Sequence, residues 1–431
     1  MRKRIIGYTA IVIMVALGWI PNIMNLLVKA QTPVASQDSG KSGAPSSGLK
    51  TPWGEPNLQG IWTEMHMTPL QRPSEFKDRE FLTEEERAKV DQEESKIAKE
   101  DERFERGTER DVDNAYSEVF HSIKQRGLRT SLIVDPPNGQ VPPLTPEAEK
   151  RKRLEREYRS ALLQSTQECK DKTAACAYGK YGPPSPWRHQ IPPFYNTGRN
   201  NLLNGPEDRS TQERCMLAVL PDFAGYRRIV QSPGVISIFY DTSQGQGWSR
   251  VIHIDAGPHL PPSFQLRWGD SRGHWEGNTL VVDVTNFSPK FSYQWSRENK
   301  HIVERFTRVD ESTIEYVVTL DDPTTWTKPW TAKQELNRQP EKPNRIYYEP
   351  RCYEGNVGLP DMLMTMRVRE REYAKGKAPN PATENYAIYD NPKRSSDAQT
   401  DLPTVGPGQP PRYSHSEPEL EKTVQGANDK K

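Results

Sequence analysis

Residues 269–287 read GDSRGHWEGNTLVVDVTNF, and this stretch decides the fold class. A polar loop with Asp270, Arg272, His274 and Glu276 leads into residues 276–279, whose Gly-Asn pair is typical of a tight hairpin turn. The apolar run at 280–282 then predicts a strand that enters a core. The stretch therefore predicts a β-rich protein with polar residues beside a strand.

The segments around this stretch repeat the pattern of strand, short polar turn and strand. They contain no helical crossovers, so we expect a mainly antiparallel meander of about eight to ten strands. Closure into a barrel-like, calycin/lipocalin-like body, or into a sandwich, would hide the edge strands, and we favour the barrel. The expected strands cover residues 57–62, 129–134, 228–231, 235–240, 250–255, 279–287, 301–309, 313–320, 331–336 and 345–349.

Two peripheral helices are expected, at about residues 83–104 and 146–168. The first begins with Thr83 and Glu86, the spacing of a capping box. The second has Thr145 as its N-cap and Pro146 at its first position. Both patterns mark helix starts, and the sparse apolar residues of the first helix indicate a surface position.

The N-terminus has the pattern of an export signal. Basic residues at 2–4 precede an apolar run and small residues before position 31, which predicts a signal peptide over 1–30, with an uncleaved anchor as the alternative. Loss of its four basic residues takes the net charge from +1 to −3. We therefore expect an exported, periplasmic or extracellular protein with no nucleic-acid partner and no stable membrane span after cleavage.

The remainder of the chain is expected to form one domain between low-complexity ends. Residues 31–52 indicate a flexible leader, 53–373 a single β-rich domain with helical insertions, and 374–431 a disordered tail. The four cysteines favour disulfides in an exported protein, and we expect Cys169 to pair with Cys176 and Cys215 with Cys352. No CxxC pair supports the alternative, a zinc site.

Several segments resemble a large family of uncharacterised exported bacterial proteins. They are residues 269–287, HIVERFTRVDESTIEYVVTLDDPTTWTKPW at 301–330 and YYEPRCYEGNVG at 347–358, with NLQGIWT at 57–63 and RTSLIVDPP at 129–137 as further parts. This chain departs from the family pattern at 255–259, which lacks an arginine between Asp255 and His259, and at Asn278, where Asp is usual. The resemblance implies export and supplies no activity. The start at 60–62 is similar to that of lipocalin-type barrels in architecture only.

The first candidate site consists of His253, Asp255 and His259. His253 and Asp255 are two positions apart on an expected strand and so share one face. Two imidazoles and a carboxylate suit a facial metal site, whereas a His/Asp pair suits general acid–base work. Ordinary polar residues at a strand end are the third interpretation.

The second candidate site follows along the chain. It consists of Asp270, Arg272, His274 and Glu276, and with Trp268 and Trp275 as aromatic walls it would form a ligand site at a barrel mouth. A solvated loop with internally paired charges is the alternative. Further on, we expect Glu304, Arg305, Arg308 and Glu315 to form cross-strand ion pairs.

Two classes of function remain open at this stage. We favour a small-molecule-binding β-barrel for an apolar or aromatic ligand. The alternative is an exported hydrolase or lyase with Asp255, His259, Asp270 and His274 as its catalytic residues, with or without a metal. The sequence contains no nucleophile elbow and no phosphate-binding glycine motif, and it indicates no particular cofactor or oligomeric state.

Overall fold

The computed structural model describes the chain in twelve ranges, all within the unit formed by Gly48–Lys431. They are residues 49–64, 66, 68–76, 79–100 (with backbone only for 93–100), 127–171, 180–191, 201–209, 213–214, 219–223, 225–241, 247–339 and 357–386. The expected signal peptide, the strand at 345–349 and most of the expected leader and tail lie outside these ranges. So do Cys176, Cys215 and Cys352.

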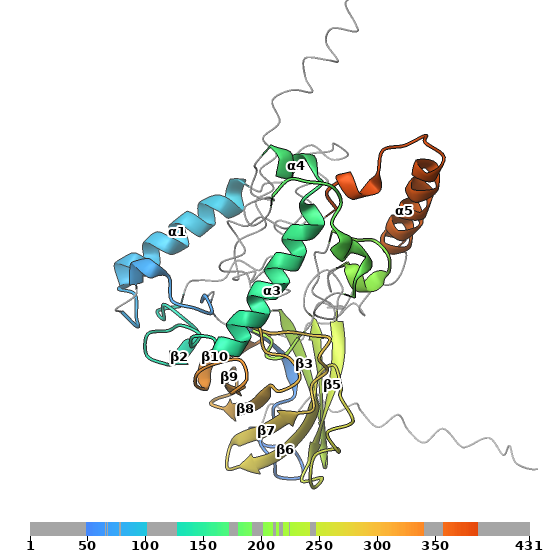
Figure 1. Cartoon of the computed structure of the whole chain (residues 1–431). Helices are drawn as coiled ribbons and strands as arrows, with labels where there is room; N and C mark the ends of the chain where they lie inside the picture. Colours follow the sequence, from blue (N-terminus) through green and yellow to red (C-terminus); the bar gives the residue numbers. More distant parts are fainter. Residues whose placement is uncertain are drawn as a thin grey trace, which may run out of the picture. The chain divides into compact units, whose positions relative to one another are not determined.

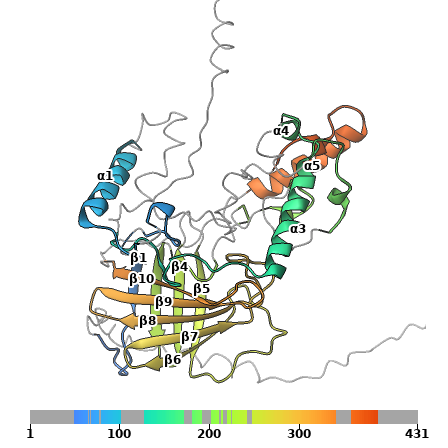
Figure 2. The same ribbon diagram turned by 60° about the vertical axis from the view of Figure 1, so that its left-hand side comes forward.

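The described residues form a mainly β protein built on a closed, mixed barrel (Figures 1 and 2). Ten described strands make one sheet, and nine of them close into the barrel because β1 pairs with both β3 and β10. The barrel strands are β1 (Gly60–Glu64), β3 (Tyr226–Ser232), β4 (Val235–Asp241), β5 (Gly247–Ile254), β6 (Asp270–Glu276), β7 (Thr279–Thr285), β8 (His301–Arg308), β9 (Thr313–Asp321) and β10 (Trp330–Arg338). The tenth, β2 (Ile133–Asp135), pairs with β10 outside the ring. The expected barrel is thus confirmed.

One pair of neighbouring barrel strands is parallel. β5 and β6 pair in parallel, with His253 opposite Arg272, whereas the other neighbouring barrel strands pair antiparallel. The segment 270–276, expected as a loop, is therefore a strand. Its Ser271, Gly273 and Trp275 face the interior, and the small size of Gly273 lets Ile252 and Ile254 pack against it. An added Cβ at Gly273 would lie 2.7 Å from Ile254 Cδ1.

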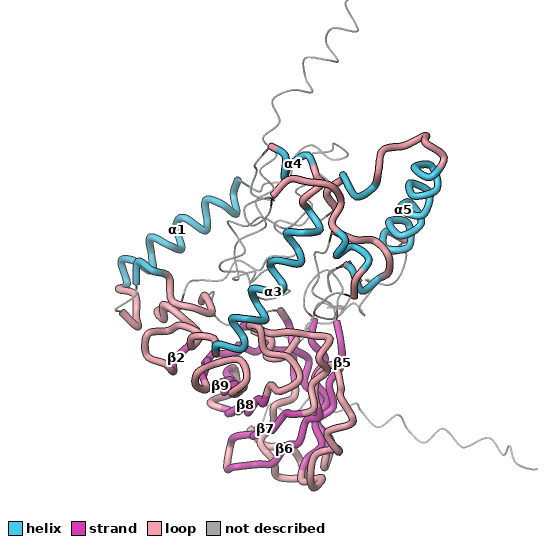
Figure 3. Tube along the Cα trace, in the orientation of Figure 1, coloured by secondary structure: helices cyan, strands magenta, loops and turns pink. Residues whose placement is uncertain are grey.

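The barrel has two different ends. At the hairpin end, tight turns join β3 to β4, β6 to β7 and β8 to β9. At the opposite, helix end, β3, β5, β6, β8 and β10 begin, and the N-terminus of α3 is bonded there to the β9–β10 loop, with Thr145 N donating to Thr325 O at 2.9 Å. Figure 3 shows that the strands gather in this barrel, with loops joining them.

The helices lie outside the sheet. They are α1 (Glu84–Glu100), α3 (Pro146–Leu163), α4 (Gln167–Lys170) and α5 (Gly358–Ala374), with short 3-10 helices η1 (Ser74–Phe76), η3 (Pro186–His189), η4 (Pro206–Asp208) and η5 (Pro381–Thr383). Among the described residues, no helix is long and apolar enough to cross a membrane.

The helix starts were predicted better than the helix ends. The capping box is confirmed, because Thr83 N donates to Glu86 Oε2 and Glu86 N to Thr83 Oγ1, and Thr145 caps α3 as expected. The expected helix at 146–168 is too long, since α3 stops at Leu163 and Thr166 caps the separate α4. Residues 375–386 of the expected tail are described, and Ser165 Oγ donates to Ala382 O in η5.

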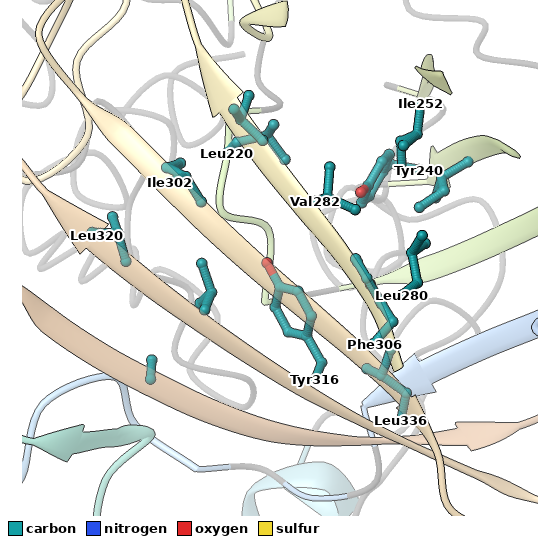
Figure 4. Close-up of a cluster of buried hydrophobic side chains, with 14 of the residues drawn as sticks. Leu220, Tyr240, Ile252, Leu280, Val282, Ile302, Phe306, Tyr316, Leu320 and Leu336 are labelled. Carbon is teal, nitrogen blue, oxygen red and sulfur yellow. The ribbon is translucent and has the colours of Figure 1, made fainter. Parts of the chain in front are cut away.

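Alternating side chains from the barrel strands fill the interior. Apolar residues of β4 to β10 form one continuous core cluster, shown in part in Figure 4, with Tyr240, Phe306 and Tyr316 among its largest members. Because the positions alternate, residues 280, 282 and 284 of β7 face inward while 281, 283 and 285 face outward.

A buried ion pair lies inside this apolar core. Arg250 Nη2 donates to Glu304 Oε2 at 2.5 Å, and both side chains are at most 2% exposed. The phenol of Tyr316 donates to the other oxygen of Glu304 at 2.9 Å, and Arg250 Nε donates to Ser271 Oγ at 2.9 Å. Burial raises the pKa of Tyr316 well above its ordinary value, so this phenol stays a donor.

The cross-strand ion pairs expected among Glu304, Arg305, Arg308 and Glu315 do not form. Because Glu304 and Arg308 face the interior while Arg305 and Glu315 face outward, they find different partners. Arg305 pairs with Glu276, Glu315 pairs with Lys333, and Glu304 pairs with Arg250.

Two arginine side chains, Arg308 and Arg338, stack on the Trp62 ring toward the hairpin end. The guanidinium of Arg308 lies 4.7 Å and that of Arg338 6.0 Å from the Trp62 ring, whose indole N–H donates to Leu58 O at 2.8 Å. Gly60, at a φ of +133°, leaves room for Arg338, because an added Cβ would lie 3.2 Å from Arg338 Nε. This packing explains the Gly-x-Trp pattern at 60–62.

We predict that Glu304→Gln destabilises the protein by about 3–5 kcal/mol, because it leaves Arg250 as an uncompensated buried charge. Urea unfolding measures the change in the free energy of unfolding. Glu315→Gln is the matched control, since its exposed pair with Lys333 contributes less than about 1 kcal/mol. The double variant Arg250→Met/Glu304→Gln should recover much of the loss, and equal effects of Glu304→Gln and Glu315→Gln would contradict the assignment.

Candidate functional sites

Polar residues that the sequence singled out meet on the outer wall of the barrel. His259 lies in the loop between β5 and β6, Asp270 and Arg272 lie on β6, and Asp283 lies on β7. His301, at the start of β8, completes the group, which we call the outer-wall cluster. Asp283 and His301 were not among the sequence candidates, although the alternation of β7 and β8 places both on the outer face.

His259 is held by carboxylates on both sides of its ring. Its Nδ1 lies 3.0 Å from Asp270 Oδ2, and its Nε2 lies 3.0 Å from Asp283 Oδ1. His301 Nε2 lies 3.0 Å from the same Asp283 oxygen. Both ring nitrogens of His259 are therefore engaged by carboxylates, which orient the ring on the outer wall.

Asp270 is the most enclosed member of the cluster, with its side chain 5% exposed. It accepts hydrogen bonds from Leu260 N at 2.9 Å and from Arg272 Nε at 3.0 Å, in addition to its contact with His259. Burial on its own would raise the pKa of Asp270, but these three partners outweigh it and hold the pKa below its ordinary value. The carboxylate is therefore stabilised in its charged form.

The outer-wall cluster secures the chain between two parallel strands. Because β5 ends at the hairpin end and β6 begins at the helix end, residues 255–269 have to return along the length of the barrel. His259 and Leu260 bind this segment to Asp270, and Asn286 Nδ2 donates to Leu260 O at 2.9 Å. These residues therefore act as a clamp: they hold residues 255–269, which we call the crossover loop, against the outer wall.

His274 and Glu276 belong to a second, exposed group. His274 Nε2 lies 3.1 Å from Glu276 Oε1, and Arg305 donates to Glu276 Oε2 at 2.6 Å. The side chains of His274 and Glu276 are each 49% exposed. Arg305 and His274 hold the pKa of Glu276 below its ordinary value. These residues lie near the hairpin end of β6 and take no part in the hydrogen bonds of His259 described above.

The expected metal ligands do not assemble into a centre. His253 faces outward on β5 opposite Arg272, and Asp255 is exposed, with a φ of 49°, just after β5. Both ring nitrogens of His259 lie within hydrogen-bond distance of carboxylates. In the described ranges, no group of three or more His, Cys, Asp or Glu side chains is arranged to hold a metal ion.

The two tryptophans expected as walls of one mouth lie at opposite ends of β6. Trp268 precedes the strand at the helix end, and Trp275 faces inward at the hairpin end and packs against the core. The five steps from Asp270 to Trp275 alone span roughly 16 Å at the usual strand rise. The two tryptophans therefore do not line a common site, and Arg272 and Glu276 point outward from the barrel.

Trp268 instead continues a row of aromatic rings that begins inside the barrel. The ring centroids of Tyr240 and Trp248 are 4.5 Å apart, and those of Trp248 and Trp268 are 3.5 Å apart, all nearly parallel. Arg267 lies over the outer side, 4.3 Å from the Trp268 ring and 4.6 Å from the Phe291 ring. The row leads from the core, where Tyr240 is 2% exposed, to the partly buried Trp268 at the helix end.

Inward-facing polar atoms lie near the same end without a partner in the described part of the chain. They are the indole nitrogens of Trp248 and Trp330, Arg227 Nη1 and Gln334 Oε1, all buried. Each such atom loses its hydrogen bonds to water on folding and costs about 1–3 kcal/mol when nothing replaces them. These residues lie in or just before expected strands, but nothing in their spacing along the chain marked them as one group.

Residues 219–223 lie across the helix end, and we call them the covering segment. Three side chains from different parts of the barrel donate to its carbonyl oxygens: Lys300 Nζ to Leu220 O at 3.1 Å, Arg227 Nη2 to Asp222 O, and Gln334 Nε2 to Phe223 O at 2.8 Å. Burial lowers the pKa of Lys300 to about 7, which the charge of Asp322 only partly opposes.

Comparisons with known proteins leave the site without an assigned chemistry. No protein-family model matches the chain, and no curated protein matches it either.

We predict that Asp270→Asn lowers the free energy of unfolding by about 2 kcal/mol at pH 7, because it weakens charge-assisted hydrogen bonds. The folded pKa is lowered, so this stabilisation is complete above the unfolded pKa of about 4 and is lost as the pH falls through the folded value. Urea unfolding at several pH values should show the two proteins converging at acid pH.

Asp255→Asn is the control for this experiment, because Asp255 is exposed beside the same loop. It should change stability little at any pH. A loss for Asp270→Asn that stays constant from pH 7 to well below pH 4 would contradict the clamp.

Proposed function

We propose that the protein is a binding protein whose barrel takes a small aromatic ligand at its helix end. The observation that carries the proposal is the aromatic row Tyr240–Trp248–Trp268, together with inward-facing polar atoms near the same end that have no partner among the described residues. Aromatic walls with a few convergent polar groups are the usual composition of small-molecule sites.

The parts of the row suggest how a ring would be held. Tyr240 and Trp248 belong to the sheet and are direct cross-strand neighbours, so their positions are fixed by the ladder. Trp268 belongs to the crossover loop, and it is the partner that can separate from Trp248 without breaking a strand pair. We expect the ligand ring to pack against this row, with Trp268 moving to make room.

The polar atoms would then give the ligand its orientation. Trp248, Trp330 and Arg227 offer donors, and Gln334 offers an acceptor. A ligand that carries both an acceptor and a donor would restore hydrogen bonds that folding removed from these groups. The covering segment lies over this region and would have to shift when a ligand enters.

We also propose that the protein works outside the cytoplasm, as a member of the family of exported bacterial proteins that it resembles. The signal-like segment 1–30 supports export, although it lies outside the described residues. A second support is Cys169, which is 1% exposed and disulfide-bonded, as is typical of oxidising compartments. Its pairing with Cys176 stays a proposal, as does that of Cys215 with Cys352.

The alternative function, a hydrolase or lyase, has weaker support. It requires Asp255, His259, Asp270 and His274 to act on one substrate. Both nitrogens of His259 already contact carboxylates, and His274 is bonded instead to the exposed Glu276. Asp255 is exposed and takes part in neither group of bonds.

The proposal predicts that the neutral fluorescent probe N-phenyl-1-naphthylamine binds the purified protein, and that Trp248→Leu and Trp268→Ala each weaken binding at least about fivefold. Loss of one stacking ring removes roughly 1 kcal/mol in addition to buried area. Fluorescence titration gives the dissociation constants.

Trp275→Leu is the matched control, because Trp275 is also partly buried against the core but lies at the hairpin end. It should bind the probe like the unmodified protein. No saturable binding to the unmodified protein, or equal losses for all three variants, would refute the proposed function.

A further inference from the structure

Arg227 is a buried cation that faces the barrel interior beside the proposed ligand site. It lies on β3, is 1% exposed, and is among the largest fully buried side chains. Its Nη2 donates to the backbone oxygen of Asp222, while Nη1 is buried without a partner in the described part of the chain.

Arg250, which is also deep in the barrel, is neutralised differently. It pairs with the carboxylate of Glu304 and also contacts Ser271 and Tyr240. Within the described ranges, Arg227 has no ion pair with a carboxylate, and its one bonded oxygen belongs to a neutral peptide group. A buried charge is costly unless an opposite charge and hydrogen bonds compensate it. In the described part of the chain, Arg227 therefore lacks an anion like the one that Arg250 has.

Arg227 and the aromatic row are on neighbouring strands in one register. Arg227 on β3 is directly opposite Tyr240 on β4, and Tyr240 is directly opposite Trp248 on β5. The guanidinium carbon lies 5.9 Å from the Tyr240 ring. Arg227 and Trp248 thus lie on the two sides of Tyr240, two strand spacings, roughly 10 Å, apart.

We infer that the ligand is an aromatic anion that binds at the helix end beside this row, with its acidic group, a carboxylate or a similar oxyanion, on Arg227. This inference rests on the proposed function and adds the charge of the ligand to it. Nη1 donates to the anion while Nη2 keeps its bond to Asp222 O, so the covering segment stays anchored at that carbonyl when the ligand is bound.

Two arrangements compete with this assignment. Arg227 holds the covering segment, but Gln334 and Lys300 hold neighbouring carbonyls of the same segment, and an amide suffices for that task at Phe223. A water molecule on Nη1 would satisfy one hydrogen bond and would leave the charge uncompensated. Neither arrangement compensates the charge of the Arg227 guanidinium, whereas an anionic ligand does.

The test compares two probes that differ by one acidic group. 8-Anilinonaphthalene-1-sulfonate has the ring system of N-phenyl-1-naphthylamine with a sulfonate added. We expect the unmodified full-length protein to bind the sulfonate at least tenfold more tightly than the neutral probe. Arg227→Met should abolish this preference, so that the two probes bind it with about equal affinity, while Arg227→Lys should keep most of the preference.

Arg228→Gln is the matched control, because Arg228 is the next residue on β3 and faces outward. It should keep the full preference for the sulfonate. Binding of the neutral probe shows that Arg227→Met is folded, and the comparison of the two probes in the unmodified protein needs no variant. Displacement of the neutral probe by 1-naphthoate and by 1-naphthyl phosphate then ranks carboxylate against phosphate.

Equal affinities of the two probes, an unchanged preference in Arg227→Met, or equal displacement by neutral 1-naphthamide would overturn the inference. Those results leave the proposed function standing, because the aromatic site still binds the neutral probe. Absence of binding by both probes refutes the proposed function itself, and the two failures are thus distinguishable.

Discussion

The barrel depends on one parallel pair of strands, β5 and β6. An antiparallel neighbour is reached through a tight turn, as the hairpins at 232–235, 276–279 and 308–313 show. A parallel neighbour requires the chain to return along the whole barrel, and here residues 255–269 make that return outside the sheet. His259, between Asp270 and Asp283, holds this segment on the outer wall, and so the polar cluster there is explained by the topology.

The functional question therefore moves from the outer wall, whose carboxylates and imidazoles bond one another, to the barrel interior. Buried donors without a partner in the described part of the chain lie at both ends, on Arg227 and Trp248 at the helix end and on Arg308 and Trp275 at the hairpin end. The row of stacked rings beside Trp248 distinguishes the helix end, and it is the reason that we propose the ligand there.

The hydrophobic alternation of β7 to β10 and the hairpin turns were predictable from sequence, because period-two patterns and Gly-Asn turns are local signals. The capping residues Thr83 and Thr145 were predictable for the same reason. The strand β6 was mistaken for a loop, since its inward positions hold Ser271 and Gly273, which do not look apolar. Its parallel pairing with β5 is a long-range property that no local pattern carries.

The sites show the same division between local and long-range signals. Sequence reasoning found His259 and Asp270, which meet in space. It missed Asp283 and His301 in the same cluster, and it missed the interior group, because Arg227, Trp248 and Gln334 come from strands far apart in the chain. The placement of Trp268 and Trp275 in one mouth failed because they flank β6 at opposite ends.

The most direct test of this account is a crystal structure of the protein with N-phenyl-1-naphthylamine bound. The account predicts the naphthyl ring at the helix end, stacked on Trp248 with Trp268 displaced, and His259 still between Asp270 and Asp283. A probe bound on the outer wall against His259 or His301, with the interior row unchanged, would contradict it.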